Sequence, residues 1–149
     1  MLLPLDFIGF LKSPIGKAKN FTWSEALYLP RWDIHCLPQG AEIFANIEQA
    51  AEKMQTIRDI FDKSIRVTSW FRPPKYNEAI GGSKKSSHMV GLACDFQVLG
   101  MDADSVRSAL LPSLETLNVR MENLPKANWV HIDLNCSTET PKEKRFFKP

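Results

Sequence analysis

Two histidines and an aspartate are the side chains of this chain best suited to bind a metal. His88 and Asp95 lie in one short run, residues 86–95, and His131 lies in the alternating segment 128–133. A lone His and Asp would more often form a satisfied pair in the core, but a third ligand changes the balance. Catalytic zinc normally uses three such protein ligands and keeps a fourth position for water, whose pKa it lowers to about 7. The three residues therefore predict a hydrolytic zinc site.

Three separated motifs carry these residues. The first is Ser86-Ser87-His88-Met89-Val90-Gly91-Leu92-Ala93-Cys94-Asp95, and the second is Trp129-Val130-His131-Ile132-Asp133. The third lies upstream, in residues 68–77, and reads Thr-Ser-Trp-Phe-Arg-Pro-Pro-Lys-Tyr-Asn. In this order they resemble the zinc D-alanyl-D-alanine carboxypeptidase family of peptidoglycan peptidases, which shares its fold with the hedgehog signalling domain. The resemblance covers roughly residues 20 to 135.

The resemblance implies roles for the residues around the metal. Arg72 matches an arginine that the family places against a carbonyl or carboxylate oxygen of the substrate, where a fixed guanidinium meets the charge that develops in the transition state. Ser87 stands where the family often has Gln, and it is a candidate for binding peptide polar groups. Tyr76 and Asn77 match family positions as well, either in substrate binding or in holding the loop.

The general base is the point at which this chain departs from the family. Many members carry Glu or Asp three residues before the second histidine, whereas this chain has Asn128. Glu122 is the best replacement, because its strand is expected to pair with the strand of His131; a solvated hairpin glutamate is the alternative. Asp133 is the next candidate, although it could equally orient a metal ligand from behind.

The surrounding pattern predicts a single domain over residues 1–149, of the α+β class, with an antiparallel sheet flanked by helices. Apolar residues at three- and four-residue steps predict a long scaffold helix over Gln39–Asp62. Strands are expected at residues 65–69, 92–99, 119–122 and 129–134, with Asp95 on the face opposite Phe96. A capping box at Thr22 and Glu25 starts a short helix, and Asp102 or Asp104 caps another over 105–111.

Composition excludes several classes of protein. Of the 149 residues, 44% are hydrophobic and 24% are charged, as in ordinary globular domains, and a net charge of +2 gives no reason to expect nucleic-acid binding. Three cysteines without paired spacing do not indicate a disulfide framework and fit a reducing compartment. His35 and Cys36 find no third ligand nearby, so His35 is expected to be structural. No apolar run approaches the roughly 20 residues of a membrane span.

The two ends of the chain are expected to be accessory. Residues 1–20 are interpreted as a strap packed on the domain, because Pro4 and Asp6 interrupt the apolar start and no basic region precedes it. Residues 137–149 are expected to form a peripheral tail. With no export signal evident, we expect either a cytoplasmic enzyme or a phage-encoded lysis enzyme released to the cell wall, in either case a monomer.

Together these features predict zinc-dependent hydrolysis of peptide bonds in peptidoglycan stem peptides, at a bond involving D-alanine. Carboxypeptidase, dipeptidase and endopeptidase activity remain open, because they differ in how the ends of the cleft are closed. The alternative is a binding or structural module that keeps the fold and the zinc without turnover, and Asn128 favours it.

Overall fold

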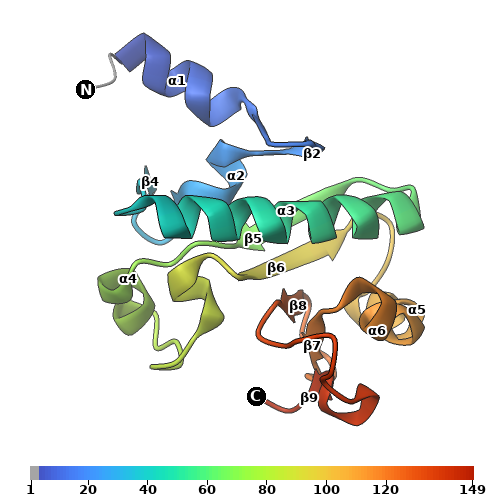
Figure 1. Cartoon of the computed structure of the whole chain (residues 1–149). Helices are drawn as coiled ribbons and strands as arrows, with labels where there is room; N and C mark the ends of the chain where they lie inside the picture. Colours follow the sequence, from blue (N-terminus) through green and yellow to red (C-terminus); the bar gives the residue numbers. More distant parts are fainter. Residues whose placement is uncertain (1–3) are drawn as a thin grey trace.

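The structure is a computed structural model that describes residues 4–149, in which helices and short strands form a mixed α/β domain (Figure 1). The helices are α1 (Pro4–Lys12), α2 (Trp23–Leu27), α3 (Ala41–Phe61), α4 (Pro74–Ala79), α5 (Ala103–Leu110) and α6 (Leu114–Leu117), with 3-10 turns η1 (Ser87–Val90), η2 (Leu111–Ser113) and η3 (Lys142–Lys144). The strands are β1 (Pro14–Ile15), β2 (Ala18–Thr22), β3 (Tyr28–Leu29), β4 (Ile34–His35), β5 (Ile65–Ser69), β6 (Ala93–Val98), β7 (Arg120–Glu122), β8 (Val130–Asp133) and β9 (Phe146–Phe147).

A five-stranded sheet in the order β5-β6-β8-β7-β9 carries two of the three predicted metal ligands, Asp95 on β6 and His131 on β8. Its first four strands pair antiparallel, and they lie within the four predicted segments. The fifth strand, β9, pairs parallel with β7 and has no counterpart in the prediction. Two-stranded sheets β1-β2 and β3-β4 lie outside this sheet.

Alternation along the strands gives the sheet two chemically different faces. Because residues paired across strands point the same way, Cys94, Phe96, Ile132, Met121 and Phe146 share one face. The first four side chains are fully buried, and Phe146 packs against the same apolar cluster, so this is the core face. The other face carries the polar residues of β6, β7 and β8.

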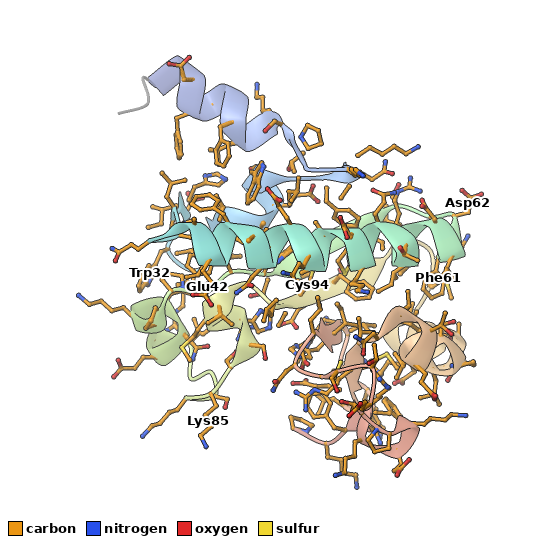
Figure 2. All side chains as sticks on the ribbon, in the orientation of Figure 1. Trp32, Glu42, Phe61, Asp62, Lys85 and Cys94 are labelled. Carbon is orange, nitrogen blue, oxygen red and sulfur yellow. The ribbon has the colours of Figure 1, made fainter. Side chains whose placement is uncertain are left out.

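Helix α3 covers the core face. Its buried residues Ile47, Ala50, Met54 and Ile57 recur at three- and four-residue steps and belong to the same apolar cluster as the strands. Figure 2 labels Cys94 of β6 next to this helix. The helix runs over Ala41–Phe61, inside the predicted range, and ends where Asp62 takes the left-handed conformation.

Local signals account for the starts of the shorter helices. The predicted capping box is confirmed: Thr22 and Glu25 satisfy each other's backbone N–H groups at the start of α2. Of the two candidates for α5, Asp102 is the cap, since its carboxylate accepts from the N–H of Ser105. After α5, Pro112 lies in the turn η2 rather than in a continuous helix.

The N-terminal strap predicted over residues 1–20 includes residues 1–3, which lie outside the described residues. From residue 4 onward the segment forms α1, β1 and most of β2. Phe10 stacks on Trp23 and meets the edge of Phe44 on α3, while Ile15 and Ala18 are buried. The segment is therefore held to the domain by aromatic and aliphatic contacts.

The C-terminal segment is more than the peripheral tail expected from the sequence. Its strand β9 forms one edge of the main sheet, and Arg145 just before it is 1% exposed. The Arg145 guanidinium donates to the carbonyls of Thr140 and Ser137 and to the side chain of Asn118. These bonds hold the tail in its fold and tie it to Asn118, which lies just before β7.

Among residues 4–149, no helix is both long enough and apolar enough to cross a membrane.

Candidate metal centre

The polar face of the sheet brings the three predicted metal ligands together. Asp95 on β6 stands directly opposite His131 on β8 in the strand register, and His88 reaches them from the turn η1. The three residues are only 2% to 8% exposed. One ligand atom from each lies within 4.8 Å of the others, so the group could hold a metal ion.

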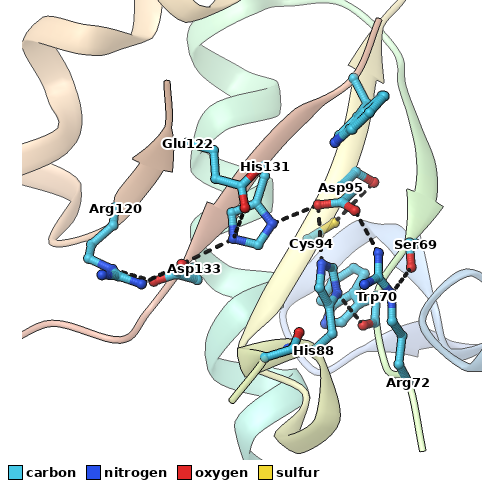
Figure 3. A network of polar contacts seen from close by, with 12 residues as sticks. Ser69, Trp70, Arg72, His88, Cys94, Asp95, Arg120, Glu122, His131 and Asp133 are labelled. Carbon is cyan, nitrogen blue, oxygen red and sulfur yellow. Dashed lines mark hydrogen bonds and ion pairs between the residues drawn. The ribbon is translucent and has the colours of Figure 1, made fainter. Parts of the chain in front are cut away.

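One oxygen of Asp95 is the point on which both histidines converge (Figure 3). Asp95 Oδ1 lies 3.2 Å from Nε2 of His88 and 2.7 Å from Nδ1 of His131. The two rings meet edge to face, with their centroids 5.2 Å apart. The shared oxygen and the two ring nitrogens therefore define one small site.

The far side of the His88 ring is fixed by the backbone. Nδ1–H of His88 donates to the carbonyl oxygen of Trp70 at 2.7 Å, and the Trp70 indole donates to the carbonyl of Gly91. Gly91 ends the turn η1 at a φ of 80°, a conformation that glycine adopts without strain. With Nδ1 protonated, the lone pair of Nε2 is the one directed into the site.

A carboxylate fixes the far side of the His131 ring. Nε2–H of His131 donates to Oδ2 of Asp133 at 3.0 Å. Arg120 in turn donates from Nε and Nη2 to both oxygens of Asp133, at 2.8 and 3.0 Å. Such a histidine–carboxylate pair is the usual way in which proteins orient a metal-binding imidazole.

Arg72 holds the remaining oxygen of Asp95. Its Nη2 donates to Asp95 Oδ2 at 3.0 Å, while its Nε donates to the hydroxyl of Ser69. Its backbone N–H donates to the carbonyl of His88. Arg72 therefore braces two of the three candidate ligands.

Without a metal, the buried charges of the group depend strongly on each other. Burial opposes ionisation of Asp95, but the charges and hydrogen bonds of His88 and His131 outweigh it and lower the pKa of Asp95. Burial also opposes a charge on His131, yet hydrogen bonds to Asp133 and Asp95 and the charges of Asp95 and Glu122 raise its pKa to about 9. A cation entering the site must therefore displace a proton from His131.

The arrangement fits a zinc ion. Nitrogen and carboxylate oxygen are ordinary zinc ligands, and three protein ligands are the number that leaves a position open. The lone pair of His88 Nε2 and the carboxylate oxygen of Asp95 face each other and repel unless a proton or a cation lies between them. Both imidazoles already use their other nitrogen, as metal-binding histidines do.

The site opens into a cleft of about 420 Å³. Besides the three candidate ligands, the cleft is lined by residues of several segments: Arg72, Ser83, Lys85, Ser86, Ser87, Arg120, Glu122, Trp129, Asp133, Asn135, Phe147, Lys148 and Pro149. The candidate metal group is therefore buried but borders an open cleft, which has room for a small ligand.

The remaining predicted residues fall into two groups. Arg72, Ser87, Glu122 and Asp133 line the cleft, with Glu122 Oε1 4.0 Å from His131 Nε2. Tyr76 and Asn77 do not line it, and both are buried. The Tyr76 hydroxyl accepts from the N–H of Arg31, and the Asn77 amide donates to the carbonyl of Ser83. These contacts support the loop, and a role of Tyr76 and Asn77 in substrate binding stays a prediction.

His35 lies at a different place in the domain. Its Nε2 is 2.9 Å from the hydroxyl of Ser24, and its ring packs against Tyr28. It belongs to the β3-β4 hairpin and lines none of the metal cleft.

Sequence reasoning missed several residues of the cleft. Arg120 could have been found, since pairing the two predicted strands places it opposite Asp133, on the polar face. Phe147 and Lys148 carried no comparable signal, because they reach the cleft through a parallel pairing of β9 with a strand far back in the chain.

Comparison with known proteins agrees with this geometry. No curated protein sequence matches the chain at a significant level. A family model described as Peptidase M15 matches residues 26–133, which include α3, β5, β6 and β8 and all three candidate ligands. This range covers most of the 149 residues. The chain therefore belongs to the peptidase M15 family.

Proposed function

We propose that this protein is a zinc-dependent peptidase that cleaves peptide bonds of peptidoglycan stem peptides, at a bond involving D-alanine. The observation that carries the proposal is the convergence of His88 Nε2, His131 Nδ1 and Asp95 Oδ1 at the base of an open cleft. Membership of a peptidase family supports the reaction class. The resemblance to D-alanyl-D-alanine carboxypeptidases supports the substrate and a fold of the hedgehog type.

His88, Asp95 and His131 are the residues that would hold the zinc. A zinc ion bound there would supply Lewis acidity toward water and toward a peptide carbonyl. The protein's own contribution is to fix the ligands, since each has its remaining polar atom held by Trp70, Arg72 or Asp133. Preorganised ligands spare the site from rearranging when a cation or a substrate arrives.

Glu122 is the best-placed general base. It lines the cleft on the polar face, beside His131, and its carboxylate accepts no hydrogen bond from the residues that the structure describes. A carboxylate with free oxygens can accept a proton from attacking water and return it to the leaving amine. Glu122 would thus do the work for which Asn128 is unsuited.

Asp133 has the opposite environment. It is 1% exposed, and its oxygens accept from Arg120, His131 and the N–H of Asn135. A carboxylate whose lone pairs are all engaged is poorly suited to shuttle protons, so we assign Asp133 to orienting His131.

Arg72 is the proposed electrophilic residue. Its Nη1 makes no hydrogen bond to any residue in the described range 4–149, although Nη2 and Nε are engaged. The free N–H groups of a fixed guanidinium could meet the substrate oxygen on which charge develops. Ser87, at the edge of the same cleft, is the proposed contact for a peptide polar group.

The alternative function is a zinc-containing module without turnover, which Asn128 favours. Digestion of purified peptidoglycan, followed by mass spectrometry of the released peptides, separates the two. The proposed enzyme releases peptides, loses this activity with a chelator and regains it with zinc. Stoichiometric zinc without any released peptide would support the module instead. A phage-type lysis enzyme and a cytoplasmic enzyme acting on wall-derived peptides would both meet such substrates.

A further inference from the structure

The C-terminal strand touches the metal centre although it lies outside the family match, which ends at residue 133. Phe147 on β9 pairs with Glu122 in the strand register, so its side chain is on the polar face of the sheet. Its ring meets the ring of His131 edge to face, with centroids 6.2 Å apart. The same ring carries the Arg120 guanidinium 4.0 Å above its centroid.

Arg120 connects this aromatic ring to the candidate metal ligand. Stacked on Phe147, its planar guanidinium presents Nε and Nη2 side by side to the two oxygens of Asp133. Asp133 then accepts from Nε2–H of His131. The contacts run without a gap from β9 through β7 to the ring whose Nδ1 faces Asp95.

The position of Phe147 is fixed by the backbone around it. The carbonyl of Phe147 accepts from the N–H of Asn123, and the carbonyl of Arg145 accepts from the N–H of Met121. Arg145 is itself buried and bonded to four backbone or side-chain oxygens. A ring held at both ends of its strand is a firm support for the guanidinium above it.

We propose that Arg120 and Phe147 are positioning residues for the metal centre, acting on His131 through Asp133. The proposal rests on the zinc site proposed above. Without the two N–H groups of Arg120, the Asp133 carboxylate loses the paired hydrogen bonds that hold it in place and can turn away from His131. The His131 ring would then lose the contact at Nε2 that keeps Nδ1 directed at the cation.

Zinc affinity is the measurement that tests this role, by competition with a chromophoric chelator on the full chain. Arg120→Gln should weaken zinc binding about tenfold or more, the usual effect of removing an outer partner of a ligand. Phe147→Leu should weaken zinc binding about two- to fivefold, because the variant keeps an apolar side chain but lacks the ring that lies under the Arg120 guanidinium. Melting of the metal-free variants reports whether they fold.

Neighbouring residues provide matched controls. Phe146→Leu makes the same change one position earlier on β9, where the side chain packs in the core, so it should lower the melting temperature without weakening zinc binding. Arg66→Gln removes an exposed arginine of β5 that lines none of the metal cleft and should leave zinc affinity unchanged. Equal losses of affinity in Phe146→Leu and Phe147→Leu would overturn the role of Phe147.

A double-mutant cycle shows whether Arg120 acts through Asp133. In an Asp133→Asn background, Arg120→Gln should weaken zinc binding by much less than in the wild type. Additive losses would overturn the proposed route. Should Arg120→Gln fail to fold, Arg120→Lys keeps a cation but not the paired hydrogen bonds, and unchanged affinity in that variant would overturn the proposal.

The wild type separates the two levels of inference. A wild-type chain that binds no zinc overturns the proposed function itself. If the wild type binds zinc and the folded Arg120→Gln variant binds zinc equally tightly, only the positioning role is overturned.

Discussion

Glu122 and Asp133 are both carboxylates of the polar sheet face, but their surroundings give them different chemistry. Glu122 lines the cleft with its oxygens free of hydrogen bonds from the described residues, whereas Asp133 is buried between Arg120 and His131. Glu122→Gln should lower the rate of peptide hydrolysis by about 10² to 10⁴, the usual share of general acid–base catalysis, and leave zinc affinity intact. Steady-state kinetics and zinc titration of the same preparation check this.

The companion variant Asp133→Asn keeps the shape of the side chain and serves as the control. It should weaken zinc binding about 10- to 100-fold, because it removes the charge that orients His131. Full activity in Glu122→Gln would assign the proton transfer to another group. Equal zinc affinity in the wild type and Asp133→Asn would remove Asp133 from the support of the ligand.

The ligand assignment makes a prediction about stoichiometry. His131→Ala should abolish binding of one zinc ion per chain, because two remaining ligands are too few for a tight site. His35→Ala is the matched histidine control, since His35 contacts Ser24 and Tyr28 away from the cleft. Metal analysis of both purified variants decides the matter. Undiminished zinc in His131→Ala, or lost zinc in His35→Ala, would contradict the assignment.

At this scale, the sequence could place residues that carry chemistry and sit in regular strands. Asp95 and His131 occupy the same face of neighbouring strands, and strand alternation is readable from the sequence alone. Arg72 could be singled out from the sequence as a candidate for contact with the substrate, but not as the partner of Asp95 Oδ2. That bond depends on how the chain turns after β5, which no local pattern encodes.

The loop between α4 and η1 is the element that shapes one side of the cleft. Asn77 ties this loop together through the carbonyl of Ser83, and a Cβ added to Gly82 would lie only 2.1 Å from Asn77 Oδ1. Gly82→Ala should therefore displace the loop and destabilise the fold by about 1 to 3 kcal/mol. Because the loop borders the cleft, the substitution should raise KM more than it lowers kcat. Thermal melting and steady-state kinetics measure the two effects.

A second substitution tests the cause. Asn77→Ala removes the atoms that the new Cβ would meet, so Gly82→Ala should cost less in that background than in the wild type. Equal destabilisation in both backgrounds would mean that the contact with Asn77 is not the reason. Asn77→Ala also removes the hydrogen bond to the carbonyl of Ser83, so the cost of Gly82→Ala in that background is measured against the Asn77→Ala single variant.

At the scale of elements, length and periodicity decided what could be predicted. The long helix α3 and the strands β5 and β6 lie within their predicted segments, since each repeats its pattern over five or more residues. Strand β9 has only two residues and pairs in parallel with β7, which is distant in sequence, so no local sequence pattern predicts it. Long-range pairing of short strands depends on the whole fold.

At the scale of the whole molecule, the two faces of the main sheet have different roles. The core face, covered by α3, supplies the apolar burial that holds the strands in register. The opposite face uses that register to bring residues from β6, β7, β8 and β9 to one cleft. A one-residue slip of β8 would turn His131 into the core, so the apolar face indirectly specifies the metal site.

Zinc binding should therefore stabilise the entire domain. Its three candidate ligands are buried and lie on separate elements, so the unfolded chain cannot present them together. Free zinc at a thousand times its dissociation constant would add about 4 kcal/mol, which for a domain of this size raises the melting temperature by roughly 8 to 16 °C. Melting of the protein with chelator and with added zinc measures this shift. His131→Ala should show little or none of it, and an equal shift in that variant would place the stabilising zinc elsewhere.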